Sequence, residues 1–119
     1  MRARKASVLI VDDDEDIRDA LHLLFSLDGF DVVGEAADGL EAVRLAESHQ
    51  PSFVILDYRM PLLNGEATAG LLRASSPGSR IVAFSAVLES KPEWADAYLN
   101  KERISDIAPL VERLVDAAG

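Results

Sequence analysis

With 119 residues and no cysteine, the chain has the length of one domain and can form neither a disulfide nor a thiolate metal site. Its formal net charge of -9 argues against nucleic acid as a direct partner, because contacts to phosphates need lysine and arginine patches. No apolar stretch approaches the roughly 20 residues of a membrane span, and the basic start does not continue as a secretory signal. We therefore expect a single cytoplasmic domain that binds neither a membrane nor nucleic acid.

Five short apolar runs alternate with segments of helical periodicity. The runs occupy residues 8–11, 32–33, 53–56, 81–84 and 97–99 and read as strands. Apolar residues spaced three and four apart predict helices within 17–27, 40–46, 67–72 and 107–115. Such alternation predicts an α/β fold, in which a doubly wound parallel sheet carries helices on both faces.

The connection between the fourth and fifth strands breaks this pattern. It contains Pro92 and is too short for more than about two turns of helix. We therefore expect the helix at this place, the fourth of the fold, to be short or irregular.

Acidic residues follow two of the buried runs. Asp12 and Asp13 come directly after the first run, and Asp57 comes directly after the third. In open α/β sheets the carboxyl ends of the strands form the edge where ligands bind. At about 4 Å and an effective dielectric near 20, each pair of these carboxylates would repel by roughly 4 kcal/mol. A hard divalent cation relieves that repulsion, so the sequence predicts a Mg²⁺ site beside Asp57.

Together with residues after the other strands, these acids resemble the receiver domain of two-component response regulators. The resemblance covers nearly all of residues 1–119, as a single receiver domain, and rests on Asp12-Asp13, Asp57, Met60-Pro61, Gly65, Ser85-Ala86 and Lys101. It implies a five-stranded parallel sheet in the order 2-1-3-4-5, an order for which another member of this family is a known example. Strands one and three would then flank one crevice that holds the acids.

The resemblance also implies roles for the acids and for Arg59. Asp57 would be the nucleophile that takes a phosphoryl group from a histidine kinase or phosphotransfer protein. Asp13 would bind Mg²⁺ directly, Asp12 through a water molecule, and Arg59 through its backbone carbonyl. Catalysis would rest on positioning and electrostatic stabilisation, and the domain would act on itself rather than as an enzyme on a separate substrate.

Three further residues complete the resemblance. Lys101 would bring a compact positive charge to a phosphoryl oxygen, and the Ser85 hydroxyl would donate to another. Tyr98 matches the aromatic switch residue of the family, although a fixed core aromatic is the alternative. Gly65 reads as part of an Asn64-Gly65 turn in which a positive φ lets the loop close over the site.

Two departures from the family pattern lie in the connections before and after the fifth strand. Glu102 follows Lys101, where the family usually has proline with a cis bond before it. A cis bond before glutamate would cost about 2.5–4 kcal/mol, so we expect a trans bond and a differently shaped loop. Fewer residues than usual separate Ser85 from Lys101, so the fourth helix must be short or irregular. This puts in doubt the output surface that the family commonly forms from helix four, strand five and helix five.

The main interpretation is a phospho-accepting switch that works through protein–protein contacts, with a homodimer as one form of output. A second is the amino-terminal receiver of a longer DNA-binding regulator, which residues 34–39 resemble. A third is a pseudo-receiver used only for assembly. An aspartyl phosphatase is disfavoured because Arg59 stands where a second acid is needed, and a nucleotide-binding domain because no glycine-rich loop follows the first strand.

Overall fold

A five-stranded parallel sheet forms the centre of the protein, in a computed structural model that describes residues 6–118. The strands are β1 (Ser7–Val11), β2 (Asp31–Ala36), β3 (Phe53–Leu56), β4 (Arg80–Ser85) and β5 (Ala97–Asn100). They pair in parallel in the order β2-β1-β3-β4-β5. Each predicted apolar run lies within one of these strands, so the fold class and the strand order are confirmed.

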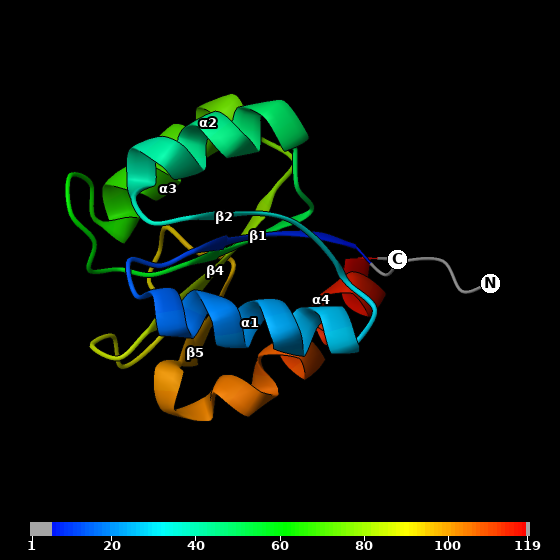
Figure 1. Cartoon of the computed structure of the whole chain (residues 1–119). Coiled ribbons are helices and arrows are strands. Elements are labelled where there is room, and N and C mark those ends of the chain that lie inside the picture. The colour runs from blue at the N-terminus through cyan, green and yellow to red at the C-terminus, as the bar shows by residue number, and fades with distance from the viewer. Residues whose placement is uncertain (1–5, 119) are drawn as a thin grey trace.

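Helices cover both faces of the sheet. They are α1 (Glu15–Leu27), α2 (Gly39–His49), α3 (Gly65–Ser75), the 3-10 helix η1 (Lys101–Asp106) and α4 (Ile107–Ala118). Figure 1 shows α2 and α3 on one side of the sheet and α1 and α4 on the other. Among the described residues, no helix is both long enough and apolar enough to cross a bilayer.

The two faces of the sheet have separate apolar cores. Alternate residues of β1 divide between them, as the period of two in a strand requires. Val8 and Ile10 pack in the cluster that contains Phe25 of α1, while Leu9 and Val11 pack in the cluster that contains Leu72 of α3. Because β1 and β3 are buried on both faces, the acids that follow them are held at the end of a rigid central pair of strands.

The connection between β4 and β5 contains no helix. Residues 86–96 run through bends and a single turn, in which the Ala95 N–H donates to the Pro92 carbonyl at 3.2 Å. The sequence left room for a short or irregular helix, and the structure goes further because no helical segment forms. Pro92 has no N–H to donate to a preceding turn, and side-chain contacts described below hold the segment instead.

The connection after β5 also differs from the family pattern, as expected. The structure has no cis peptide bond within residues 6–118, so the bond between Lys101 and Glu102 is trans. Asn100 caps η1 by accepting the Glu102 N–H at 2.8 Å. Lys101 is therefore the first residue of a helical turn that begins directly at the edge of the sheet.

Candidate functional site

The backbone ladder of the sheet continues into the acidic residues. The Asp12 N–H donates to the carbonyl of Ala36 and the Asp57 N–H to the carbonyl of Val11, each at 3.0 Å. Because β1 and β3 are neighbours, the two acids leave the sheet side by side. Carboxylate oxygens of Asp12, Asp13 and Asp57 all lie within 4.8 Å of one another. The structure thus brings together the three acids that the sequence singled out.

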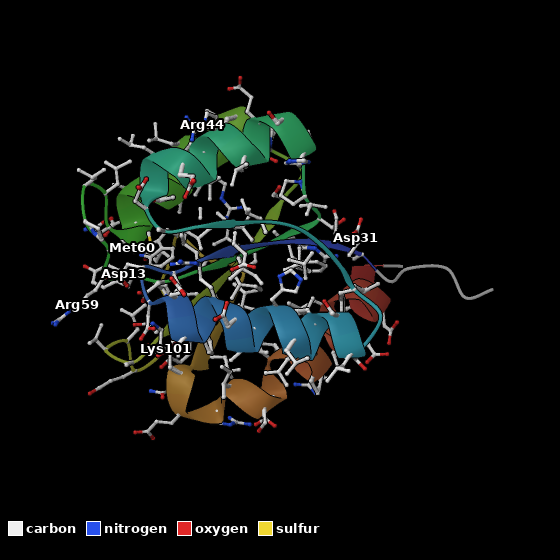
Figure 2. The ribbon with its side chains drawn as sticks, in the orientation of Figure 1. Asp13, Asp31, Arg44, Arg59, Met60 and Lys101 are labelled. Atoms are coloured by element: carbon white, nitrogen blue, oxygen red, sulfur yellow. The ribbon has the colours of Figure 1, made fainter. Side chains whose placement is uncertain are left out.

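A single lysine faces the two buried acids. Asp12 is 1% exposed and Asp57 is 5% exposed, whereas Asp13 is open to solvent. Lys101 Nζ lies 2.7 Å from Asp12 Oδ2 and 3.3 Å from Asp57 Oδ2. Figure 2 shows Asp13 and Lys101 at the same end of the sheet, away from Asp31 at the start of β2. Among residues 6–118, the two buried carboxylates therefore share the Lys101 ammonium group, and the Asp13 carboxylate lies beside them.

Burial and crowding perturb the acid–base properties of this group. Burial, and next the negative charge of Asp12, raise the pKa of Asp57 to about 6, although Lys101 and the backbone of Tyr58 act in the opposite direction. For Lys101, burial alone would lower the pKa, but its contacts with Asp12 and Asp57 outweigh burial and raise it. At neutral pH the site therefore carries excess negative charge in a poorly solvated place.

One oxygen of Asp12 has no hydrogen bond. Asp12 Oδ1 accepts the Asp14 N–H at 2.9 Å, whereas the buried Oδ2 meets Lys101 only as an ion pair without hydrogen-bond geometry. Three clustered carboxylates, two of them buried and one exposed, are a donor set that suits a hard divalent cation such as Mg²⁺. The residues present therefore fit the predicted metal.

Two residues beside the acids shape the loop rather than the donor set. Asp14 is the N-cap of α1, where its side chain accepts the N–H groups of Asp16 and Ile17. Arg18 NH1 donates to the Asp12 carbonyl at 2.8 Å, a contact that the sequence analysis missed. Side chains on a helix tilt toward its N-terminus, and this rule would have directed Arg18 back toward the loop.

Ser85 and Tyr98 meet at Leu88. The Ser85 Oγ is buried and accepts the N–H groups of Val87 at 3.1 Å and of Leu88 at 3.3 Å. The half-buried Tyr98 donates its hydroxyl to the Leu88 carbonyl. A hydroxyl that accepts two bonds still has one proton to donate, so Ser85 remains able to bind an incoming anion. Both side chains thus hold the segment between β4 and β5.

The side chain of Arg59 does not join the acids. It is exposed, and Figure 2 shows it extending away from the protein. The sequence predicted a metal contact through the Arg59 backbone carbonyl, and that contact stays a prediction.

The role expected for Gly65 is wrong. Gly65 is the first residue of α3, behind the N-cap Asn64, and the residue with positive φ in this loop is Leu62, at 72°. A Cβ on Gly65 would lie 2.6 Å from the Asp57 carbonyl oxygen and 2.9 Å from the Tyr58 Cα. Glycine is therefore required because α3 begins directly against the backbone of the acidic residue, and not because of its own backbone angles.

Comparisons with known proteins point to one family. The model of the response regulator receiver domain matches residues 8–105. The transcriptional regulatory protein PdtaR of Mycobacterium tuberculosis is 40% identical over 114 residues, which cover 91% of this chain and 56% of that protein. The nitrate/nitrite response regulator NarL of Escherichia coli is 38% identical over 104 residues, covering 82% of this chain and 48% of that protein. The chain spans about half the length of these curated relatives.

Solved structures agree with this family at the level of the fold. The signal receiver domain of the putative response regulator NarL from Mycobacterium tuberculosis superposes with a TM-score of 0.82 at 29% identity, covering 95% of this chain and 98% of that one. A CheX–CheY–BeF3–Mg complex from Borrelia burgdorferi superposes with a TM-score of 0.79 at 27% identity, covering 95% of this chain and 89% of that one.

Proposed function

The chain belongs to the receiver domains of two-component response regulators, and on that premise we propose that Asp57 accepts a phosphoryl group and thereby switches protein–protein contacts. Receiver domains are signalling domains rather than classical enzymes. The observation that carries the proposal is a buried Asp57 at the end of β3, with Lys101 at 3.3 Å and two further carboxylates within 4.8 Å.

The proposed donor is the phosphohistidine of a histidine kinase or a phosphotransfer protein. A carboxylate oxygen of Asp57 attacks phosphorus, an O–P bond forms, the P–N bond breaks, and its electron pair returns to the imidazole nitrogen. With a pKa of about 6, Asp57 is mainly ionised at pH 7 and ready to attack. Lys101 meets the charge that spreads over the phosphoryl oxygens in the transition state.

We further propose that Asp12, Asp13, Asp57 and the Arg59 carbonyl hold Mg²⁺. The metal would supply positive charge beside the phosphoryl oxygens and would offset the repulsion among the acids. The clustering of the three carboxylates and the exposure of Asp13 support this assignment, since oxygen ligands suit Mg²⁺ and Asp13 offers an entry from solvent.

Ser85 is the proposed link between the phosphoryl group and the rest of the domain. If its hydroxyl donates to a phosphoryl oxygen, the Val87 and Leu88 N–H groups that it holds must follow or find other partners. Leu88 in turn carries the hydrogen bond from Tyr98. This connection supports the proposed switch role of Ser85 and Tyr98.

Intact mass measurement after incubation with Mg²⁺ and phosphoramidate tests the acceptor. We expect one phosphoryl adduct on the wild type that needs Mg²⁺ and is absent from Asp57→Asn. Asp16→Asn, which removes an exposed acid from the first turn of α1 outside the site, serves as the folded control and should label like the wild type. Equal labelling of Asp57→Asn would refute the assignment. A wild type that never takes phosphate would favour the assembly-only pseudo-receiver.

A melting experiment tests the metal ligands. Asp13→Asn removes a hard oxygen ligand and also relieves repulsion, so the metal-free variant should melt slightly higher than the wild type. Added Mg²⁺ should raise the melting temperature of the wild type, because a ligand that binds only the folded state stabilises it, and should have little effect on Asp13→Asn. Normal Mg²⁺ stabilisation of the variant would contradict the ligand set.

The output of the switch has two candidates. Residues 1–119 as a complete receiver domain would act in the cytoplasm by binding a target protein or by forming a homodimer. The alternative, the receiver part of a longer DNA-binding regulator, is consistent with the similarity to the regulators PdtaR and NarL, of which the chain matches about half. The length of the native reading frame distinguishes the two.

A further inference from the structure

Trp94 packs against the turn that carries the proposed acceptor. Its ring stacks on that of Tyr58, with ring centroids 6.1 Å apart and planes inclined by 16°. The ring tip also borders Gly65, because a Cβ built there would lie 3.2 Å from Trp94 Cη2 and 2.6 Å from the Asp57 carbonyl oxygen. The indole ring therefore touches the place where α3 meets the peptide between Asp57 and Tyr58.

The backbone that carries the indole is fixed to α3 and β4. Arg73 NH2 donates to the Trp94 carbonyl at 3.1 Å, and Arg73 NH1 lies 3.2 Å from Asp96 Oδ2. Asp96 is held by Ile81, whose N–H donates to Asp96 Oδ2 at 2.7 Å and whose carbonyl accepts the Asp96 N–H at 2.8 Å. Although the segment is not helical, Trp94 thus projects from a well-anchored base.

The other side of the stack is equally constrained. The Gly65 N–H donates to the Tyr58 carbonyl at 2.7 Å, so the turn after Asp57 is tied to the start of α3. Trp94 contacts the same turn through its stack on the Tyr58 ring and through its ring tip beside Gly65. Both rings are half-buried, and Trp94 also packs against the apolar cluster that contains Leu72, so the stack lies at the rim of that core.

We propose that Trp94 is a positioning residue for the acceptor: stacked on Tyr58 and seated against Gly65, it fixes the Asp57–Tyr58 peptide and so the direction of the Asp57 carboxylate toward Lys101. The inference rests on the proposed phosphoryl transfer to Asp57. Residues 86–96 would then help to position Asp57 for phosphoryl transfer, in addition to the proposed switch role of their contacts with Ser85 and Tyr98.

The test compares three variants in the full chain by the rate of phosphorylation. Trp94→Leu and Tyr58→Leu each keep an apolar side chain but remove one face of the stack, whereas Trp94→Phe keeps an aromatic face. Rates are measured by intact mass at saturating Mg²⁺ and phosphoramidate, at a temperature well below the melting point of each variant. Mg²⁺ titrations followed by melting are run in parallel.

Both leucine variants should react about two- to tenfold more slowly than the wild type, which is the factor that one aromatic pair can contribute to a barrier. Trp94→Phe should recover most of the rate. Because Asp57 is also a proposed metal ligand, the Mg²⁺ midpoint should rise in both leucine variants and return toward the wild-type value in Trp94→Phe. A general loss of packing would instead lower the metal-free melting temperature and the rate of all three variants together, and that result would overturn the proposal.

Wild-type rates in both leucine variants would also overturn it, as would a Trp94→Phe variant that is as slow as Trp94→Leu. If Trp94→Leu does not fold, Tyr58→Leu alone decides, since it leaves the segment and its tryptophan in place. Absence of any adduct on the wild type would instead reject the proposed function, so the two failures are distinguishable.

Discussion

Two polar clusters each pair aspartate with a basic side chain, but they have opposite effects on the stability of the metal-free fold. In the acidic pocket, formed by Asp12, Asp13, Asp57 and Lys101, the two buried carboxylates share the lysine ammonium group and one buried oxygen lacks a hydrogen bond. In the clasp, formed by Arg73, Asp96 and the backbones of Ile81 and Trp94, the Asp96 side chain pairs with an arginine and accepts a backbone N–H.

Whether a carboxylate stabilises this fold depends on the cations and N–H groups that surround it, and not on its being an aspartate. In the acidic pocket the carboxylates repel one another until a cation binds. In the clasp, the ion pair and hydrogen bonds hold the segment between β4 and β5 in place, which a helix would otherwise do. Removing an acid should therefore stabilise the metal-free protein at the pocket and destabilise it at the clasp.

The largest effect is expected when the shared cation of the pocket is removed. Lys101→Met should lower the free energy of unfolding by about 3–5 kcal/mol at pH 7 without metal, because two buried carboxylates lose their compensating charge. Lys101 lowers the pKa of Asp57, so without it Asp57 takes up its proton at a higher pH than in the wild type, and the deficit should shrink as the pH falls from 7 through 6. Urea denaturation measures both, with Arg44→Met as the exposed control that should change little. A deficit equal at pH 5 and pH 7 would contradict the account.

The second effect has the opposite sign and depends on pH. The pKa of Asp57 is about 6 in the folded protein against 3.8 ordinarily, so the folded state binds this proton more tightly. The Asp57 contribution to stability should therefore fall as pH rises from about 4 to 6, by on the order of 3 kcal/mol. Asp57→Asn should lose this dependence and be more stable than the wild type at pH 7 in EDTA.

Urea midpoints at pH 4.5, 5.5 and 7 give the difference between wild type and Asp57→Asn, in which the titration of other groups cancels. Asp16→Asn in the first turn of α1 is the matched control. That exposed acid favours the helix dipole, so its loss should destabilise slightly at pH 7. A difference that does not vary with pH would show that Asp57 is not strained in the metal-free protein.

The smallest effect tests the clasp. Asp96→Ala should lower the free energy of unfolding by about 1–3 kcal/mol, because the Ile81 N–H loses its side-chain acceptor and Arg73 keeps only its hydrogen bond to the Trp94 carbonyl. Asp106→Ala removes an exposed pair with Arg103 one turn away on η1, and should cost less than about 0.5 kcal/mol. Amide exchange over residues 86–96 should quicken only in the first variant. Equal effects of the two substitutions would mean that the clasp is no more than a surface ion pair.

The sequence predicted the strands and the acids at their ends because both depend on local patterns. Runs rich in β-branched residues have few alternatives to a buried strand, and an acid directly after such a run must leave the sheet at its edge. The strand order and the function came from the resemblance. The assembly of Asp12, Asp13, Asp57 and Lys101 then followed from that order, since β1 and β3 are neighbours.

What the sequence did not show depends on contacts between distant residues. Nothing near Pro92 indicates that Arg73 and Asp96 replace a helix, or that Trp94 stacks on Tyr58 from another part of the chain. Gly65 was assigned to a turn because Asn-Gly pairs often form one, whereas the close approach of the Asp57 backbone is visible only in three dimensions.

The continuation of the sheet ladder into Asp12 and Asp57 divides the domain into a frame and moving parts. Their N–H groups extend the ladder, so the sheet holds the backbone of both residues on its side, whereas the peptide after Asp57 lies beyond it. A phosphoryl group on Asp57 would therefore be attached to a residue whose backbone is held by the central sheet. On the proposed function, we expect the response to phosphorylation at Ser85, with the Val87 and Leu88 N–H groups it holds, and at Lys101 at the start of η1. In this proposal the backbone of Asp57 stays in place, and the groups that contact its phosphoryl oxygens change position.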